Sequence, residues 1–335
     1  MKNILIISDG IPGHFNQSKG VAALLANRHS SSMKIIDLQF KSYSLRGFIT
    51  VFSRFLMKLP SPLTAKIISV LYSNISTCEL DLIIAAGGKT APYTAALRIL
   101  RQVPVILLGS PRGLHPSLFN ALVTVERYFE DSSNVVASIT PSIYSPQVCN
   151  QAAQEKELRE HLLFLIGGKG IGYSYEEDEW KSLINGIKQL HNTTNLPITI
   201  VTSRRSDPEV EKIIQSELQN IPLDYSAWFH QGATNFNLTA LFGSAKNIFV
   251  TEDSAMMISE SISSGKPVTT IFPRDIKSPL RYKAHMQKYL DLNLITRESI
   301  ENFSIKDLEN PSINVQNHLS KLCNQLEERI QWQKD

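Results

Sequence analysis

Short apolar runs alternate with helical patterns through the first part of the chain. Strands are predicted at residues 4–7, 33–38, 82–86, 103–108 and 121–125, and helices at 17–26, 48–58, 63–73 and 93–101. The predicted strands are nearly all apolar, which is typical of strands covered on both faces. Strands alternating with helices of this length indicate βαβ units and a parallel sheet.

This pattern breaks between Asn134 and Pro146, and the same scheme then repeats. Strands are predicted at residues 162–166, 198–202, 223–228, 248–250 and from 268, and helices at 151–160, 176–190, 207–218, 236–244 and 313–333. We therefore expect an α/β protein with two Rossmann-like parallel domains facing each other across a cleft. The first domain would span residues 1–150 and the second 151–310, followed by a C-terminal helical segment, 311–335.

Length and composition support two globular domains. The chain has 335 residues, of which 42% are hydrophobic and 19% charged, whereas single cores stop growing near about 250–300 residues. The net charge of +3 is too small to argue for nucleic acid as a partner. The cysteines at 78, 149 and 323 are far apart, so we expect a reducing, cytoplasmic compartment. No apolar run approaches the ~20 residues of a membrane span.

A polar loop between a strand and a helix is the first candidate site. An apolar run ends at Thr251, Asp253 and Ser254, and a helical pattern that includes Met257 then runs to Gly265. Free N–H groups at the start of a helix, together with the helix dipole, favour an anionic ligand group. We expect this stretch to hold a phosphate-bearing donor.

Two further loops end neighbouring strands of the same predicted sheet. Gly167, Gly168, Lys169 and Gly170 follow one strand, and Ser203-Arg204-Arg205 follows the next. Three glycines and a lysine can form a backbone nest for phosphate oxygens. Ser203 and Arg204 are placed to help neutralise a diphosphate, although the two arginines could instead be a solvated helix cap.

The first strand of the chain ends in a turn that is rich in polar side chains. It contains Asp9, Gly13, His14, Asn16 and Gln17. Either Asp9 or His14 could remove a proton from an acceptor hydroxyl, and the other three are acceptor-binding candidates. The alternative is structural: Asp9 would stabilise the turn and Asn16 would cap a helix beginning at Gln17.

Two other strand ends carry basic residues. Arg112 follows a strand and could hold an anionic acceptor group through two hydrogen bonds, unless it is an ordinary surface arginine. The sequence Gly87-Gly88-Lys89-Thr90 lacks the upstream glycine of a nucleotide-hydrolysing phosphate loop. A glycine turn with Thr90 capping the next helix is the expected role.

The segment from Arg46 to Tyr72 combines a helical apolar stripe with basic residues. A basic amphipathic helix can lie in an anionic lipid interface. A stripe that faces the protein core is the other interpretation. Both remain open at this point.

No pair of aspartates two residues apart occurs, and no Cys/His cluster has metal-ligand spacing. We therefore expect no metal and no other cofactor. Backbone, lysine, arginine and hydroxyl groups would have to stabilise a leaving group.

Several ordered motifs together resemble one family, over approximately residues 3–290. They are Asp9-Gly-x-x-Gly-His-x-Asn-Gln17, Ser110-Pro-Arg112, Leu165-Ile-Gly-Gly168, Thr202-Ser-Arg-Arg205, Val250-Thr-x-Asp-Ser-x-x-Met-Ile-Ser-Glu260 and Ser264-Gly-Lys-Pro-Val268. The family is the "elongated mitochondria" family of mitochondrial fission, whose bacterial members are regarded as glycosyltransferases of the lipopolysaccharide outer core.

The resemblance implies a GT-B glycosyltransferase with an acceptor-side first domain and a donor-side second domain. It also implies that the last helix crosses back to the first domain and that Glu260 contacts the donor's ribose. The expected reaction transfers a sugar from a nucleotide sugar to a lipid-linked or lipopolysaccharide-core saccharide, at the cytoplasmic face of the inner membrane. Two alternatives remain: a nucleotide-sugar 2-epimerase of the same architecture, and a non-enzymatic recruitment factor like the eukaryotic relatives.

Overall fold

A computed structural model describes residues 2–29, 31–37, 44–72, 79–127, 130, 133–232, 236–301 and 314–332. The chain forms two compact units. Unit 1 comprises Met1–Ile143 and Asn317–Asp335, and unit 2 comprises Tyr144–Gln316. No helix in the described ranges is long and apolar enough to span a membrane. Four ends of predicted elements, Leu38, Ser73, Ile313 and Gln333, lie outside the described residues.

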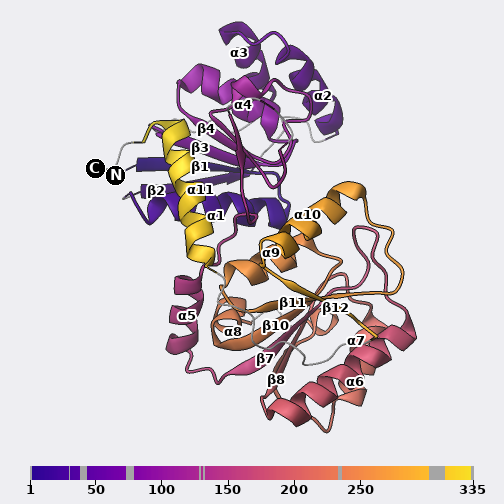
Figure 1. Cartoon of the computed structure of the whole chain (residues 1–335). Coiled ribbons are helices and arrows are strands. Elements are labelled where there is room, and N and C mark those ends of the chain that lie inside the picture. The colour runs from indigo at the N-terminus through magenta and orange to yellow at the C-terminus, as the bar shows by residue number, and fades with distance from the viewer. Residues whose placement is uncertain are drawn as a thin grey trace. The chain divides into compact units, whose positions relative to one another are not determined.

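Unit 1 is built on a sheet of six parallel strands in the order β2-β1-β3-β4-β5-β6 (Figure 1). The strands are β1 (Lys2–Ser8), β2 (Ser31–Asp37), β3 (Leu82–Ala86), β4 (Val105–Leu108), β5 (Ala121–Thr124) and β6 (Asn134–Val136). Every residue of β3 and β4 is buried, as the continuous apolar runs predict. The edge strand β2 differs, because its Met33 and Ile35 side chains are exposed.

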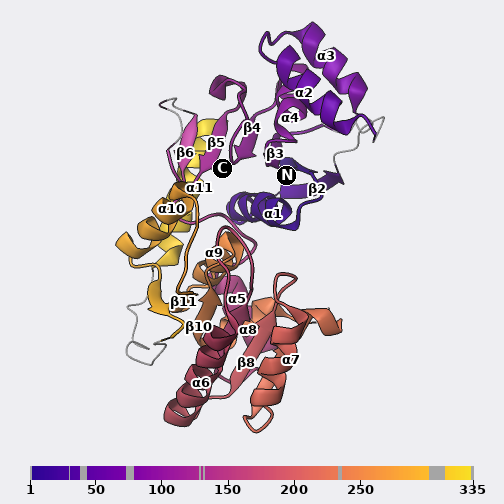
Figure 2. The same cartoon turned by 90° about the vertical axis from the view of Figure 1, so that its right-hand side faces the viewer.

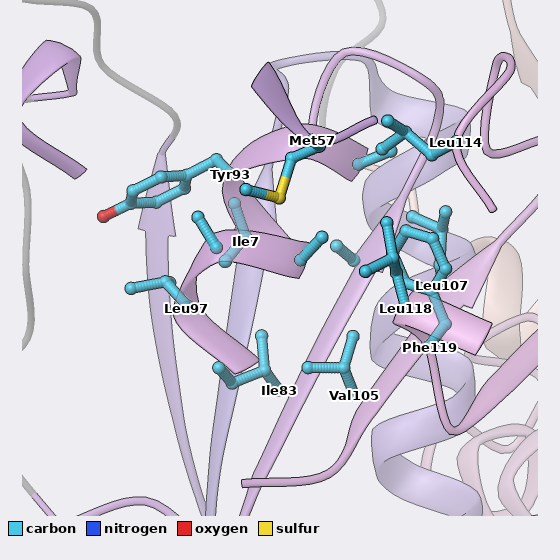
Figure 3. Packing of buried hydrophobic residues seen from close by; sticks show 14 of the residues in the cluster. Ile7, Met57, Ile83, Tyr93, Leu97, Val105, Leu107, Leu114, Leu118 and Phe119 are labelled. Carbon is cyan, nitrogen blue, oxygen red and sulfur yellow. The ribbon is translucent and has the colours of Figure 1, made fainter. Parts of the chain in front are cut away.

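Helices cover both faces of this sheet, so unit 1 has three layers and two cores. The helices are α1 (Pro12–Ala26), α2 (Arg46–Leu56), α3 (Pro62–Leu71), α4 (Ala91–Arg101) and α11 (Val315–Ile330), with a short 3-10 turn, η1 (Pro116–Leu118). One core packs α2, α3 and α4 against the sheet, and Figure 3 shows part of it, including Met57, Tyr93 and Leu107. The other core packs α1 and α11 against the opposite face.

Helix α11 belongs to unit 1 although it follows unit 2 in the sequence. Its Leu322, Cys323 and Leu326 lie in the second core, with Leu326 fully buried. The Glu327 carboxylate pairs with Arg28 at 3.0 Å and with His29 at 2.9 Å. Figure 1 shows α11, in yellow, lying along the sheet of unit 1.

Unit 2 contains a second sheet of six parallel strands, in the order β12-β11-β10-β7-β8-β9. The strands are β7 (His161–Ile166), β8 (Ile198–Thr202), β9 (Leu223–Ala227), β10 (Ala245–Thr251), β11 (Val268–Phe272) and β12 (Thr296–Ser299). With β7 counted as the first strand, this is the 3-2-1-4-5-6 order of dinucleotide-binding sheets.

The helices of unit 2 alternate with its strands along the chain, beginning with α5 before β7 (Figure 2). They are α5 (Pro146–Glu155), α6 (Glu177–Thr194), α7 (Pro208–Glu217), α8 (Leu238–Ser244), α9 (Ala255–Ser263) and α10 (Leu280–Asp291), with a 3-10 turn, η2 (Phe229–Gln231). Helices α5 and α8 approach closely, because a Cβ at Gly243 would overlap the carbonyl of Cys149.

The predicted α/β class with two parallel sheets is confirmed. Two helix starts were predicted too late. Helix α1 begins at Pro12 and not at Gln17, and α5 begins at Pro146 and not at residue 151, because proline occupies the first helical position in both. The elements β6, α10 and β12 were not predicted from the sequence.

Each sheet has one point where the chain switches direction from one side of the sheet to the other. It lies between β1 and β3 in unit 1 and between β7 and β10 in unit 2. Ligands of open parallel sheets bind beyond the carboxyl ends of the strands at such points. The loops that follow these four strands are therefore the first places to look for function.

Candidate functional site

In unit 1 an aspartate–histidine pair lies at the switch point. Asp9 follows β1, and His14 lies in the first turn of α1. Nδ1 of His14 is 3.0 Å from Oδ2 of Asp9. The Asp9 side chain is only 2% exposed, whereas that of His14 is 35% exposed. An aspartate buried behind a half-exposed histidine fixes the ring and leaves its other nitrogen, Nε2, available.

The loop after β3 completes this arrangement. Gly87 has φ +84°, and a Cβ there would lie 2.5 Å from Nδ1 of His14, so glycine is needed for both reasons. Burial alone would raise the pKa of the Asp9 carboxyl. The hydrogen bond and charge of His14, with a smaller effect of Lys89, outweigh burial and lower that pKa.

The acceptor-binding candidates Gly13, Asn16 and Gln17 also lie in the first turns of α1, half-buried. Ile11 is the N-cap residue of this helix, and no side chain caps it. The structural alternative, in which Asn16 caps a helix beginning at Gln17, is therefore wrong. All three residues are on the same helical segment as His14.

Arg112 lies beside the same loop in a strained conformation. Its φ is +53°, in the left-handed region that non-glycine residues rarely adopt. Its side chain packs so closely on Gly88 that a Cβ at Gly88 would overlap it. Backbone strain of this kind costs about 1–3 kcal/mol and clusters at functional sites.

A second arginine, Arg54 of α2, reaches the same glycine. Its Nη2 donates a hydrogen bond of 2.8 Å to the carbonyl of Gly88, while its Nε is buried without a partner among the described residues. Burial lowers the pKa of Arg54, and repulsion from Arg112 lowers it further. With the exposed Lys89, three cations surround one loop. Sequence reasoning missed Arg54, because it lies in a different element.

In unit 2 the glycine loop after β7 is packed against the loop after β10. The N–H of Gly167 donates to the Thr251 hydroxyl at 2.7 Å, and that hydroxyl donates to Oδ1 of Asp253 at 2.7 Å. A Cβ at Gly167 would overlap the Asp253 carboxylate. Residue 167 must therefore be glycine, because the Asp253 carboxylate occupies the space that a side chain would need.

Of the two adjacent arginines after β8, Arg205 is the one that contacts these loops. It donates to the backbone carbonyl of Asp253, and its Nη1 is 3.5 Å from Oδ2 of that residue. It also packs on Gly170. Arg204, the sequence-based candidate, is exposed, and Ser203 accepts a hydrogen bond from the N–H of Arg205 at 3.2 Å.

The Asp253 carboxylate thus occupies the space beside Gly167. It is fully buried. Burial raises the pKa of its carboxyl, opposed by the hydrogen bond of Thr251, the charge of Arg205 and a hydrogen bond from the backbone of Gly168. Lys169 remains exposed at the rim. The arrangement makes Asp253 a residue that positions the glycine loop and Arg205.

Helix α9 begins directly after this loop. Ser254 is its N-cap and accepts a hydrogen bond from the N–H of Met257 at 3.5 Å. Met257 and Glu260 lie on α9 and are half-buried. Glu260 is close enough to Tyr144 that, after burial, it contributes to raising the pKa of that phenol.

A buried ion pair supports the loop from behind. The Glu252 side chain is fully buried, and Arg297 donates to its two oxygens at 2.7 and 2.9 Å. Thr270 adds a hydrogen bond of 2.8 Å, and the hydroxyl of Tyr175 accepts from the N–H of Glu252 at 2.9 Å. No sequence pattern predicts this support, because Arg297 is 45 residues away from Glu252 in the chain.

A cleft of about 440 Å³ opens beside these loops in unit 2. Its lining combines aromatic and charged side chains. The lining includes Lys169, Tyr175, Trp180, Arg205, Asp207 and Glu177. This mixture of flat apolar surface and paired polar groups is typical of small-molecule sites.

Two six-stranded parallel units of this kind define the GT-B class of fold, shared by glycosyltransferases and nucleotide-sugar epimerases. The structure is similar to that of UDP-GlcNAc 2-epimerase from Neisseria meningitidis bound to UDP-GlcNAc, with a TM-score of 0.53, 13% identity, and 98% of this chain and 100% of that chain covered. It is also similar to a UDP-glucosyltransferase from Polygonum tinctorium, with a TM-score of 0.51, 12% identity and 98% of each chain covered.

The chain belongs to the mitochondrial fission ELM1 family, whose model matches residues 12–312. One relative, the uncharacterized protein RP120 of Rickettsia prowazekii (strain Madrid E), is 24% identical over 360 residues. That match covers 91% of this chain and 94% of the relative. The family resemblance expected from the sequence is thereby confirmed.

Proposed function

We propose that this protein is a glycosyltransferase that moves a sugar from a nucleotide-activated donor to a saccharide acceptor. The observation that carries the proposal is the Asp9–His14 pair, joined at 3.0 Å at the switch point of unit 1. A cleft of unit 2 beside the loops after β7 and β8, lined by Lys169 and Arg205 together with acidic and aromatic side chains, complements it. Transfer needs a base for the acceptor and a site for the donor, and we assign the base to unit 1 and the donor site to unit 2.

In the proposed reaction, Nε2 of His14 takes the proton of an acceptor hydroxyl. Asp9 accepts a hydrogen bond from Nδ1–H, holds the ring in the required tautomer and stabilises the imidazolium that forms. The acceptor oxygen bonds to the anomeric carbon of the donor sugar as the bond from that carbon to the phosphate oxygen breaks. The electron pair leaves with the nucleoside diphosphate. This proposal makes His14 the base and Asp9 its positioning partner.

The leaving diphosphate would be stabilised in unit 2 by Lys169, Arg205 and the amino end of α9 at Ser254. Lysine, arginine and helix N–H groups can supply the positive charge that a metal ion supplies in other transferases. We therefore propose that no metal is required, and that activity withstands EDTA. Glu260 is the proposed partner of the ribose hydroxyls, and Arg204 a peripheral cation.

The acceptor we propose carries an anionic group. Arg54, Lys89 and Arg112 surround the loop beside His14, and the Nε of Arg54 is buried without a partner in the described part of the chain. A phosphate or carboxylate would satisfy these groups. We propose a lipid-linked or lipopolysaccharide-core saccharide, used at the cytoplasmic face of the inner membrane.

Thermal-shift measurements of the full chain with UDP, ADP, CMP and their sugar derivatives test the donor site. Arg205→Gln should lower the apparent nucleotide affinity obtained from these shifts at least tenfold. Arg204→Gln, which changes the exposed neighbouring arginine, should lower that affinity much less. Sugar conversion without an acceptor would indicate the epimerase instead. No shift with any nucleotide would contradict an enzymatic function and favour a recruitment factor.

A further inference from the structure

Two helices of unit 1 carry large apolar side chains on their outer surface. We define the α2–α3 face by the residues Phe48, Val51, Phe55, Leu59, Leu63 and Val70. Phe48 and Phe55 are 66% and 67% exposed, and Leu59 and Leu63 are 80% and 69% exposed. Monomeric soluble proteins rarely expose contiguous apolar patches of this kind without a function.

The orientation of α2 excludes a core-facing stripe for these residues. The buried positions of α2 are Ile49, Thr50 and Ser53, two of which are polar. Phe48 and Phe55, by contrast, point away from the core, and Phe48 stacks on Phe52 with centroids 5.7 Å apart. Helix α2 therefore turns a less apolar side inward and its most apolar side outward.

Helix α3 continues the same surface. Its buried residues are Ala65, Ile68 and Ser69, while Leu63 and Val70 are exposed. Ser61 caps α3 through a reciprocal pair of hydrogen bonds with Thr64, of 3.2 and 2.9 Å. The turn between the helices is thus well defined, so the exposed side chains are held on ordered elements.

The segment that carries this face has charges of one sign only. No aspartate or glutamate occurs between Asp37 and Glu79. Lys58 and Lys66 are exposed beside the apolar residues, and Arg46 begins α2. Basic side chains beside an apolar surface complement an anionic lipid interface.

We propose that the α2–α3 face docks unit 1 onto the surface of a membrane that contains anionic phospholipid. The apolar side chains enter the boundary between headgroups and acyl chains, and the lysines contact the headgroups. This docking depends on the α2–α3 face and not on the transfer reaction. It holds whether or not the protein transfers a sugar.

A groove of about 510 Å³ lies at the end of the face. Met57, Pro60, Leu114 and Leu118 give it an apolar lining, and Lys58 and His115 are also part of it. Gly113, another lining residue, directly follows Arg112. The groove thus combines an apolar lining with Gly113, the sequence neighbour of Arg112, which suits an amphiphile with an anionic head.

Co-sedimentation of the full chain with vesicles tests the proposal. We expect binding to vesicles of 70% phosphatidylcholine and 30% phosphatidylglycerol, and at least tenfold weaker binding to pure phosphatidylcholine. A triple variant, Phe55→Ser, Leu59→Ser and Leu63→Ser, should reduce the affinity for the anionic vesicles at least tenfold. Because all three side chains are exposed, the variant should keep the wild-type melting temperature and nucleotide-induced shift.

A matched control removes three exposed apolar side chains from unit 2, by Val148→Ser, Leu158→Ser and Leu280→Ser. It should bind vesicles as the wild type does. Equal binding to both vesicle types, or equal loss in both triple variants, would overturn the proposal. A dimer that only the α2–α3 variant dissociates, without vesicle binding, would assign the face to a second copy of this chain instead.

Discussion

Arg297 forms a two-pronged ion pair with Glu252, whose side chain is fully buried and which directly precedes Asp253. Removing one partner of such a pair leaves an uncompensated charge in the interior, which costs about 3–5 kcal/mol. We expect Arg297→Met to lower the free energy of unfolding by this amount in urea denaturation.

Arg274 provides the matched control for this ion pair. It pairs with Asp178 and Glu301, but its side chain is 52% exposed. Because exposed pairs contribute about 0–1 kcal/mol, Arg274→Met should have little effect. Equal losses of unfolding free energy in Arg297→Met and Arg274→Met would show that the burial of Glu252 does not explain the effect of removing Arg297.

The packing of the glycine loop gives a second prediction. Gly167→Ala would place a Cβ into the Asp253 carboxylate, and overpacking of this kind costs about 1–3 kcal/mol. Gly47→Ala has open space around the new Cβ and lies in a helix, so it should be neutral or stabilising by up to about 1 kcal/mol. Melting temperatures and nucleotide-induced shifts should both fall in Gly167→Ala alone.

The Asp9–His14 pair predicts the effect of two substitutions on transfer. His14→Gln should lower kcat by about 10²–10⁴, the usual contribution of a positioned base, with a smaller change in the affinity for donor. Asp9→Asn should also lower kcat, because Asp9 accepts the hydrogen bond that holds the His14 ring in the required tautomer. His115→Gln, which also removes an imidazole from unit 1, is the control. An unchanged kcat in both site variants would place the base elsewhere.

Unit 2 should lose stability in mild acid. Burial, with the charges of Lys288 and Arg281, lowers the pKa of His285 to about 4, from the ~6.5 of an unfolded chain. Between these values the unfolded state binds more protons, so stability falls as the pH falls from about 6.5 towards 4 and then levels off. The loss approaches about 3 kcal/mol, at 1.36 kcal/mol per pKa unit.

Urea midpoints measured between pH 7 and pH 4 check this expectation. His285→Gln should flatten the slope, and the remaining slope should reflect His161, whose pKa burial also lowers. An unchanged slope in His285→Gln would mean that His285 does not titrate on unfolding in this range.

Helix α11 should contribute strongly to the stability of unit 1. Leu326 is fully buried in the core shared with α1, and truncating a buried leucine costs about 2–5 kcal/mol. Leu326→Ala should therefore lower the urea midpoint of unfolding clearly. Glu328→Ala, two positions along the same helix and exposed, should leave it nearly unchanged.

The strands were largely predictable from the sequence, because buried parallel strands are continuous apolar runs. The predicted ranges of β3 and β8 match the observed ones. By contrast, β12 (Thr296–Ser299) consists of polar residues at a sheet edge, so it has no such signal. The start of α1 was misplaced since Pro12 was not treated as a first helical residue.

The candidate sites were predictable only as groups of loops. That the loops after β7, β8 and β10 lie at one sheet edge follows from the order of strands. The strand order does not predict which arginine contacts Asp253, because Arg204 and Arg205 are adjacent and differ only in side-chain direction. Likewise, the period of the α2 stripe cannot distinguish an inward from an outward apolar face; burial of Ser53 and exposure of Phe55 decide it.

The placement of α11 in unit 1 has a consequence for how the chain is made. Unit 2 is in effect an insertion within unit 1, since the ribosome synthesises Tyr144–Gln316 before α11. The apolar surface of α1 and the sheet that α11 covers must stay open until the whole insertion has emerged. Unit 2 can thus mature first, and the unit that begins the chain is the last to be completed.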